Sequence, residues 1–152
     1  MNRDGWFPGF VDGEGYIGIA KRKSVYSAHL RVGNTHRGAL ELFQETFGGH
    51  IRVIHHKENQ RIVYSWKLSR RDDLERTLEA WLPYLVVKQE QAKLALQLIK
   101  YKKAYPRPWG NGTSKGRPYP MEMRARLEEL HRRIKALNKV GGHANWEGSN
   151  EV

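Results

Sequence analysis

The sequence contains no cysteine, no long apolar run and comparatively few acids. Without a thiol, the chain can form no disulfide, no Cys-ligated zinc site and no thiol nucleophile. No apolar stretch approaches the roughly 18 residues of a membrane-spanning helix, and no segment has a purely basic amphipathic face, so we expect no membrane partner. The 16 acids are outnumbered by 27 lysines and arginines among 152 residues, giving a formal net charge of +11. This excess favours a polyanionic partner, nucleic acid first, over a small-molecule substrate.

One short segment concentrates glycines and acids. Residues 7–15 read Phe-Pro-Gly-Phe-Val-Asp-Gly-Glu-Gly, and alternating strand-like sequence follows at once. We expect a helix that carries apolar side chains into an interface and ends with a carboxylate at its tip. An acid beside unsatisfied helix carbonyls is poorly placed for stability, but it is well placed beside a divalent cation such as Mg²⁺. The plain alternative is a helix-to-strand turn with solvated acids.

This segment resembles the signature of the LAGLIDADG homing endonucleases. The signature Leu-Ala-Gly-Leu-Ile-Asp-Ala-Asp-Gly maps without gaps onto residues 7–15, with its specific positions at Gly9, Asp12, Glu14 and Gly15. The sequence departs from the family at Pro8. Because proline lacks an N–H, we expect the motif helix to begin late or to bend there.

The order of the expected elements is consistent with this resemblance, which extends from residue 6 to about residue 101. Helix, two strands, helix, two strands and further helices form the αββαββα core of the family, an α+β fold. Its four antiparallel strands form one sheet with helices on one face. We expect strands over 16–22, 26–33, 50–56 and 61–68, and helices over 38–47, 72–82 and 86–101. Thr35 or Asn34 is the expected cap of the 38–47 helix, and Gly48-Gly49 its end.

A single domain is expected over residues 1–140. Residues 104–120 hold most of the prolines and are expected to form a long loop. A charged helix over 120–138 follows, and residues 141–152 form a loose tail. The apolar stripe of that helix is Met123, Leu127, Leu130, Ile134 and Leu137. Because the motif begins at residue 7, we see no signal peptide and expect an intracellular, cytoplasmic protein.

The uncovered face of the expected sheet is basic and nearly free of acids. Such a face suits the major groove of double-stranded DNA, which admits β-ribbons. A strand of about eight residues spans roughly 25 Å, or about seven base pairs, so one chain reads a half-site at most. The alternative is that these charges only keep a solvent face soluble and prevent edge pairing. The expected strand contacts to DNA are Arg22, Ser27, His29, Arg31, His50, Arg52, His56, Arg61 and Lys67, with Lys21, Lys23 and Arg37 on phosphates.

The resemblance also implies roles in catalysis. Glu14, the last acid of the motif, would be the metal ligand, with the Gly13 carbonyl as a second oxygen donor to Mg²⁺ or Mn²⁺. Lys88 lies in a segment that looks like the family's Pro-to-Lys-Gln-x-Gln-Ala stretch, near the scissile phosphate. Asn34 would orient the attacking water, and a helix cap is the alternative for this residue. Asp12 is expected to be structural.

A single copy of the motif implies a symmetric homodimer. Its expected interface is Phe7, Pro8, Gly9, Phe10 and Asp12. The implied function is a metal-dependent, site-specific endonuclease, encoded within an intron or intein, that cuts both strands of a long pseudo-palindromic target. One alternative is a LAGLIDADG protein without cleavage activity, serving as an RNA maturase or a transcription regulator. Another is a basic ribosome-associated or structural nucleic-acid protein.

Overall fold

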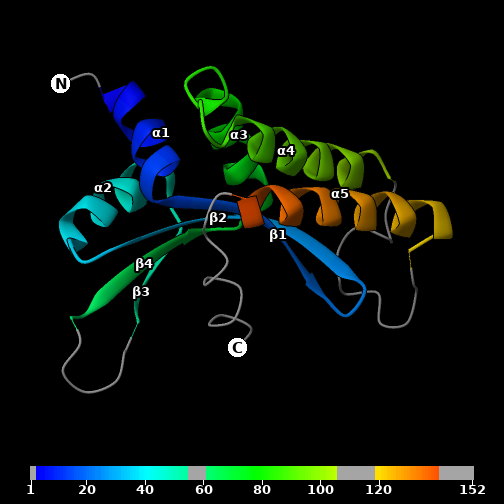
Figure 1. The fold of residues 1–152 in the computed structure, drawn as a ribbon, viewed down its shortest axis with the longest axis horizontal. Coiled ribbons are helices and arrows are strands. Elements are labelled where there is room, and N and C mark those ends of the chain that lie inside the picture. Colours follow the sequence, from blue (N-terminus) through cyan, green and yellow to red (C-terminus); the bar gives the residue numbers. More distant parts are fainter. Residues whose placement is uncertain (1–2, 55–60, 106–118, 141–152) are drawn as a thin grey trace.

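The structure is a computed structural model that describes residues 3–54, 61–105 and 119–140. Figure 1 shows one sheet with the helices gathered over one of its sides. Among the described residues, no helix is both long and apolar enough to cross a membrane. In chain order, the elements are α1 (Arg3–Glu14), β1 (Gly15–Arg22), β2 (Val25–Asn34), α2 (Arg37–Phe47), β3 (His50–Ile54), β4 (Val63–Leu68), α3 (Arg71–Trp81), α4 (Gln89–Ala104) and α5 (Met121–Val140).

The four strands form one antiparallel sheet in the order β1-β2-β4-β3, which confirms the expected αββαββα core. Side chains alternate between the two faces, as the pleat requires. Ile17 on β1 pairs with Leu30 on β2, which pairs in turn with Leu68 on β4, and all three are buried. This apolar face receives the helices, and the polar residues between these positions point to the other side.

An aromatic cluster joins α1 to the sheet through α2. The ring of Phe7 lies 4.9 Å from Phe43 and 4.8 Å from Phe47, centroid to centroid. Phe43 is 4.9 Å from Trp66 on β4, and Phe47 is 4.9 Å from Trp81 on α3. Edge-to-face packing of large rings supplies much apolar burial and fixes their relative orientation. The expectation that Phe7 lies at a dimer interface is therefore wrong, because its side chain is buried in its own chain's core.

Helix boundaries differ from the expected ones in three places. The motif helix begins at Arg3 and continues through Pro8, so it does not begin late. Pro8 lies inside the helix, where it removes one intrahelical hydrogen bond and its ring crowds the carbonyl four residues earlier. Helix α2 is capped by His36, whose Nδ1 accepts the Ala39 N–H at 3.1 Å, rather than by Asn34 or Thr35. Helix α4 begins at Gln89, three residues after the expected start.

The C-terminal helix α5 braces the first hairpin. Its Met123, Leu127, Leu130 and Ile134 are buried as expected, whereas Leu137 is exposed. The buried Asn138 side chain donates to the Ile17 carbonyl at 3.0 Å. Glu128 accepts hydrogen bonds from the Lys21 ammonium and the Tyr26 hydroxyl on β1 and β2. The expected strand ends at 55–56 and the loop centre at 106–118 lie outside the described residues, as does the tail from 141.

Candidate functional site

The last turn of α1 presents an exposed carboxylate where the helix passes directly into β1. Glu14 ends the helix and is exposed, as is Gly13 before it. Gly15 begins the strand, and a Cβ there would lie 2.8 Å from the Val11 carbonyl oxygen and 2.7 Å from a Val11 methyl. Only glycine allows so tight a junction. The motif therefore places Glu14 at the edge of the sheet rather than in a loop.

Asp12 ties this helix end to the segment before α4. Its two carboxylate oxygens accept the Val86 N–H at 2.7 Å and the Lys88 N–H at 3.0 Å. The Lys88 ammonium in turn donates to the Asp12 carbonyl at 2.6 Å. Three hydrogen bonds thus connect Asp12 to Val86 and Lys88, which lie 74 and 76 positions further along the chain. These contacts are the structural role expected of Asp12, and its place in a dimer interface stays a prediction.

Lys88 is a buried cation beside two acids. The residue is only 3% exposed, and burial lowers the pKa of its ammonium, while the charges of Asp12 and Glu14 oppose that shift. Lys88 occupies the N-cap position of α4 rather than its first turn, because residues 86–88 form bends. The ammonium thus lies within electrostatic range of the Glu14 carboxylate, as a charge-stabilising group there requires.

The donors around Glu14 are hard oxygens. No group of three His, Cys, Asp or Glu side chains converges on one point in the described part of the chain. An exposed carboxylate and an adjacent backbone carbonyl, Gly13, are nevertheless a fitting set for Mg²⁺, which keeps several waters and takes further oxygens from a phosphate substrate. The residues present therefore fit a substrate-completed metal site and do not fit an all-protein cage.

Asn34 and Arg37 lie just beyond the end of β2 and are engaged locally. The Asn34 side-chain oxygen accepts the His36 N–H at 2.8 Å, which stabilises the entry to α2. Arg37 pairs with Glu41 at 2.9 Å and lies over the Tyr64 ring. Asn34 thus makes a local hydrogen bond of the kind expected near a helix start, although the N-cap residue itself is His36. A role for Asn34 in orienting water stays a prediction.

The sheet face opposite the helices carries a dense group of cations. Strand register places Arg31 opposite Lys67, and Lys67 opposite His50. Burial lowers the pKa of Lys67, and the charges of Arg31 and Arg52 lower it further. Burial and the charge of Arg52 also lower the pKa of Arg31. The strands thus hold like charges together on one face, an arrangement that complements a polyanion.

The comparisons with known proteins agree with this geometry. No protein-family model matches the chain. The DNA endonuclease I-CvuI of Chlorella vulgaris is 32% identical over 110 residues, which span 62% of this chain and 62% of that protein. A structure of I-CvuI with its DNA target and Ca is 27% identical, with a TM-score of 0.64 over 89% of this chain and 81% of that one.

In sequence and in fold, the chain is similar to the LAGLIDADG homing endonucleases. More distant structures share the fold. The archaeal intron-encoded homing endonuclease I-Vdi141I, complexed with DNA, has a TM-score of 0.67 at 16% identity and covers 89% of this chain and 83% of its own. The residues of the motif thus stand on the helix-to-strand junction of a LAGLIDADG fold.

Most of the expected DNA contacts lie on the outer face of this LAGLIDADG sheet or at its ends. Arg22, Ser27, His50 and Arg52 are exposed there, Arg31 and Lys67 are partly buried, and Lys23 is exposed in the hairpin turn. Arg61 is exposed ahead of β4, and His56 lies outside the described residues. Whether each residue contacts DNA stays a prediction.

Two of these residues are engaged within their own chain. Lys21 points to the helix side of the sheet and pairs with Glu128 at 2.8 Å, because it alternates with Arg22. His29 is on the expected face but only 7% exposed, stacked on Tyr16 at 5.5 Å. Burial lowers the pKa of His29 to about 3, with the charges of Arg31 and Lys67 adding to the effect. His29 is therefore a neutral support beneath the cationic face rather than a free reader of bases.

Tyr16 is the site residue that sequence reasoning missed. It lines a small notch together with Glu14, Gly15, Arg31 and Gly33, and its ring covers His29. Register pairs Tyr16 with Arg31, so the two side chains share one face. The signal was the strand alternation, which places Tyr16 on the same face as Arg22.

We expect Asp12→Asn to destabilise the fold without removing the metal ligand. The new amide turns a donor towards one of the two N–H groups of Val86 and Lys88, which should cost about 1–3 kcal/mol in the free energy of unfolding. Chemical denaturation measures that loss, and calorimetric titration with Mg²⁺ measures metal affinity. Loss of DNA cleavage with stability, dimerisation and DNA binding intact would assign the metal to Asp12 instead of Glu14.

We expect acid to destabilise the protein through His29. Its pKa is about 3 in the folded state against an ordinary value of 6.5, so protons bind the unfolded state preferentially as pH falls below 6.5. The free energy of unfolding should fall by about 2 kcal/mol from this group between pH 7.5 and 5. Denaturant titrations of His29→Gln should lack this component. Equal pH dependence in the variant and the wild type would contradict the assignment.

Proposed function

We propose that the protein is a site-specific DNA endonuclease that acts as a homodimer and cuts both strands of a long pseudo-palindromic target. The observation that carries the proposal is the exposed Glu14 carboxylate at the tip of α1, beside the buried Lys88 ammonium and at the edge of the cationic sheet face. The match to I-CvuI, described as a DNA endonuclease, supports this reading.

Glu14 and the Gly13 carbonyl would hold a divalent cation, for which we propose Mg²⁺, with Mn²⁺ as a substitute. Bound there, the cation would supply Lewis-acid stabilisation of the phosphate and a more acidic water. The structures of I-CvuI with Mg or Ca support divalent metal use in this fold. The protein's own contribution is to hold the Glu14 oxygens at the sheet edge, where bound DNA would bring its backbone.

Lys88 would stabilise negative charge that develops on the phosphate beside Glu14. Its ammonium is held by the Asp12 carbonyl at 2.6 Å, which leaves two N–H groups for other acceptors. A cation held in a partly desolvated position is worth more to a developing negative charge than one in bulk water. The hydrogen bonds of Asp12 thus position both the end of α1, which carries Glu14, and the Lys88 ammonium.

A second copy of the chain would complete the enzyme. One α1 tip supplies one such carboxylate, and a double-strand break needs one for each strand. The outer side of α1 is lined by Gly5, Gly9 and Gly13, where an added Cβ would meet nothing within 4 Å. Val86 and Val87 are 83% and 66% exposed, and Val86 is bonded to Asp12 on this helix. Apolar side chains beside an open helix face suit an isologous two-fold contact.

Glu14→Gln should abolish cleavage while DNA binding remains. Loss of a metal ligand removes several kcal/mol of transition-state stabilisation, which corresponds to at least about a thousandfold in rate. The assay incubates protein and Mg²⁺ with a randomised long-target DNA library. Cuts by wild type at a pseudo-palindrome identify the target.

The matched control is Glu90→Gln, an exposed acid on α4 that pairs only with Lys93 among the contacts found in the described residues. It should cut like wild type. Sequence-selective binding without cuts by the wild-type protein would overturn the endonuclease proposal and favour a maturase or regulator.

Gly9→Leu should disrupt the dimer and leave the protomer folded. A side chain at Gly9 meets nothing within its own chain, so the protomer accommodates it, whereas a partner helix packed on that face cannot. Sedimentation equilibrium measures the dimer, and thermal unfolding checks the fold. Arg133→Leu is the control, because Arg133 is an exposed residue of α5 outside the proposed interface. An unchanged dimer constant in Gly9→Leu would place the interface elsewhere.

A further inference from the structure

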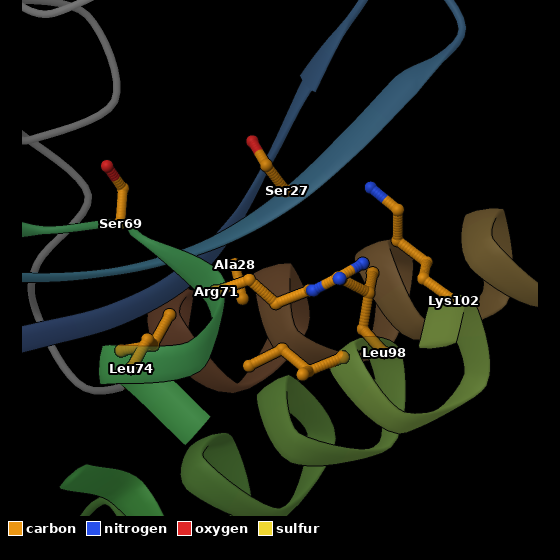
Figure 2. Close-up of a pocket in the computed structure, with 8 residues that line it drawn as sticks. Ser27, Ala28, Ser69, Arg71, Leu74, Leu98 and Lys102 are labelled. Carbon is orange, nitrogen blue, oxygen red and sulfur yellow. The ribbon is translucent and has the colours of Figure 1, made fainter. Parts of the chain in front are cut away.

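A second basic site lies at the flank of the sheet, away from Glu14. A cavity of about 50 Å³ opens between β2, the β4–α3 connection and α4 (Figure 2). Figure 2 shows the nitrogen-bearing ends of Arg71 and Lys102 directed towards this space from α3 and α4. The polar residues of its lining are Ser27, Ser69, Arg71 and Lys102, and the apolar ones are Ala28, Leu74, Leu98 and Ile99.

The cavity exists because β2 is longer than its neighbour β4. The pairing of β2 with β4 stops at Leu30 opposite Leu68, after which the chain turns through Ser69 into α3. The first half of β2 therefore has no strand on that side. Lys102 reaches across from α4 and donates to the Tyr26 carbonyl at 2.6 Å. The ammonium keeps two further N–H groups for another acceptor.

The charge in this cavity is not neutralised by its own lining. None of its eight lining residues is an acid. Burial lowers the pKa of Lys102, and the nearby charge of Arg71 lowers it further. The Arg71 Nε atom lies 4.0 Å from a carboxylate oxygen of Asp72, and that oxygen is closer to the Lys103 ammonium, at 3.6 Å. Two cations held together at a concave site favour an anion with several oxygens.

The site adjoins the face proposed to bind DNA. Ser27 lines the cavity and belongs to the same face of β2 as Arg31, because the two residues are four apart along the strand. A sheet inserted into the major groove, about 12 Å wide, has a row of phosphates along each rim. Groups at the flank of the sheet are therefore placed to meet phosphates rather than base edges.

We propose that Arg71 and Lys102, with the hydroxyls of Ser27 and Ser69, bind a phosphate group of the DNA backbone beyond the bases that the sheet reads. This inference rests on the proposed function, since it extends the DNA contact of the same protein. The Arg71 guanidinium offers paired N–H donors to two phosphate oxygens, and the ammonium offers single donors. One such contact per protomer would occur twice in the dimer.

A purely structural role makes a different prediction. Lys102 alone would serve to cover the unpaired carbonyl edge of β2, and Arg71 would only shield Leu74 with its aliphatic stem. In that case, removing the Arg71 charge would leave the ionic-strength dependence of DNA binding unchanged. Counterion release separates the two roles, because each phosphate contact contributes about 0.9 to the slope of log affinity against log salt.

The test compares Arg71→Gln with wild type in DNA binding at several salt concentrations, without divalent metal. In Arg71→Gln, the slope of log affinity against log salt should become less steep by about 1 per protomer, or about 2 for the dimer on its full target. The matched control is Lys100→Gln, which removes one charge from α4 at a position that pairs with Glu79 at 3.0 Å. Its slope should equal that of wild type. Lys102→Met keeps the stem, and its slope should decrease similarly if it folds.

The outcomes separate this inference from the proposed function. Equal slopes for Arg71→Gln and wild type, with cleavage intact, overturn the phosphate site alone. A smaller slope in the variant, with no cleavage by wild type, supports the site and overturns the endonuclease proposal. Calorimetric titration with inorganic phosphate tests the other source of the same chemistry. Phosphate binding that Arg71→Gln abolishes, without any change in slope, assigns the cavity to a free anion instead of DNA.

Discussion

The hydrogen bonds of Asp12 are the constraint on which the rest of the site depends. Its carboxylate accepts the N–H groups of Val86 and Lys88, and its carbonyl accepts the Lys88 ammonium. A buried ammonium is costly without acceptors, and a backbone N–H group removed from water is costly without a partner. The three bonds give the ammonium and both N–H groups an acceptor. They also hold the end of α1, and therefore Glu14, against the start of α4.

A second organising feature is the difference between the two sheet faces. One face is covered by helices and filled with aromatic and aliphatic side chains. The other gathers Arg31, Arg52 and Lys67, whose mutual repulsion opposes folding and is relieved when a polyanion arrives. Beneath them, His29 stays neutral and stacks on Tyr16. A neutral support adds no further positive charge to a face that is already crowded.

The flank of the sheet also gathers cations, but at a strand edge rather than on the sheet face. Where β4 ends, the exposed edge of β2 is covered by Lys102 rather than by another strand. Lysine blocks edge pairing and, beside Arg71, makes a concave cationic site. The feature that protects the strand edge and the feature proposed to bind phosphate are thus one arrangement. The repulsion between the charges of Arg71 and Lys102 would be weaker with DNA bound against them.

Local sequence was sufficient for the element order, the faces of the strands and the resemblance to the family. Strand alternation placed Ile17 and Leu30 inside and Arg31 outside, because side chains alternate whatever the sheet packs against. The motif of residues 7–15 marked the helix tip and its acid, because its glycines and acids align without gaps to the family signature. The expected roles of Lys88 and Asn34 came from the resemblance and not from periodicity.

Tertiary packing alone decided what lies over each residue. Sequence could not show that Phe7 packs on Phe43 within one chain, that His29 is covered, or that Lys21 meets Glu128 across more than one hundred positions. It also could not place Arg71 beside Lys102, since these residues lie on different helices. Periodicity reports the direction of a side chain relative to its own backbone. Burial and charge depend on neighbours brought from elsewhere, which only the folded chain supplies.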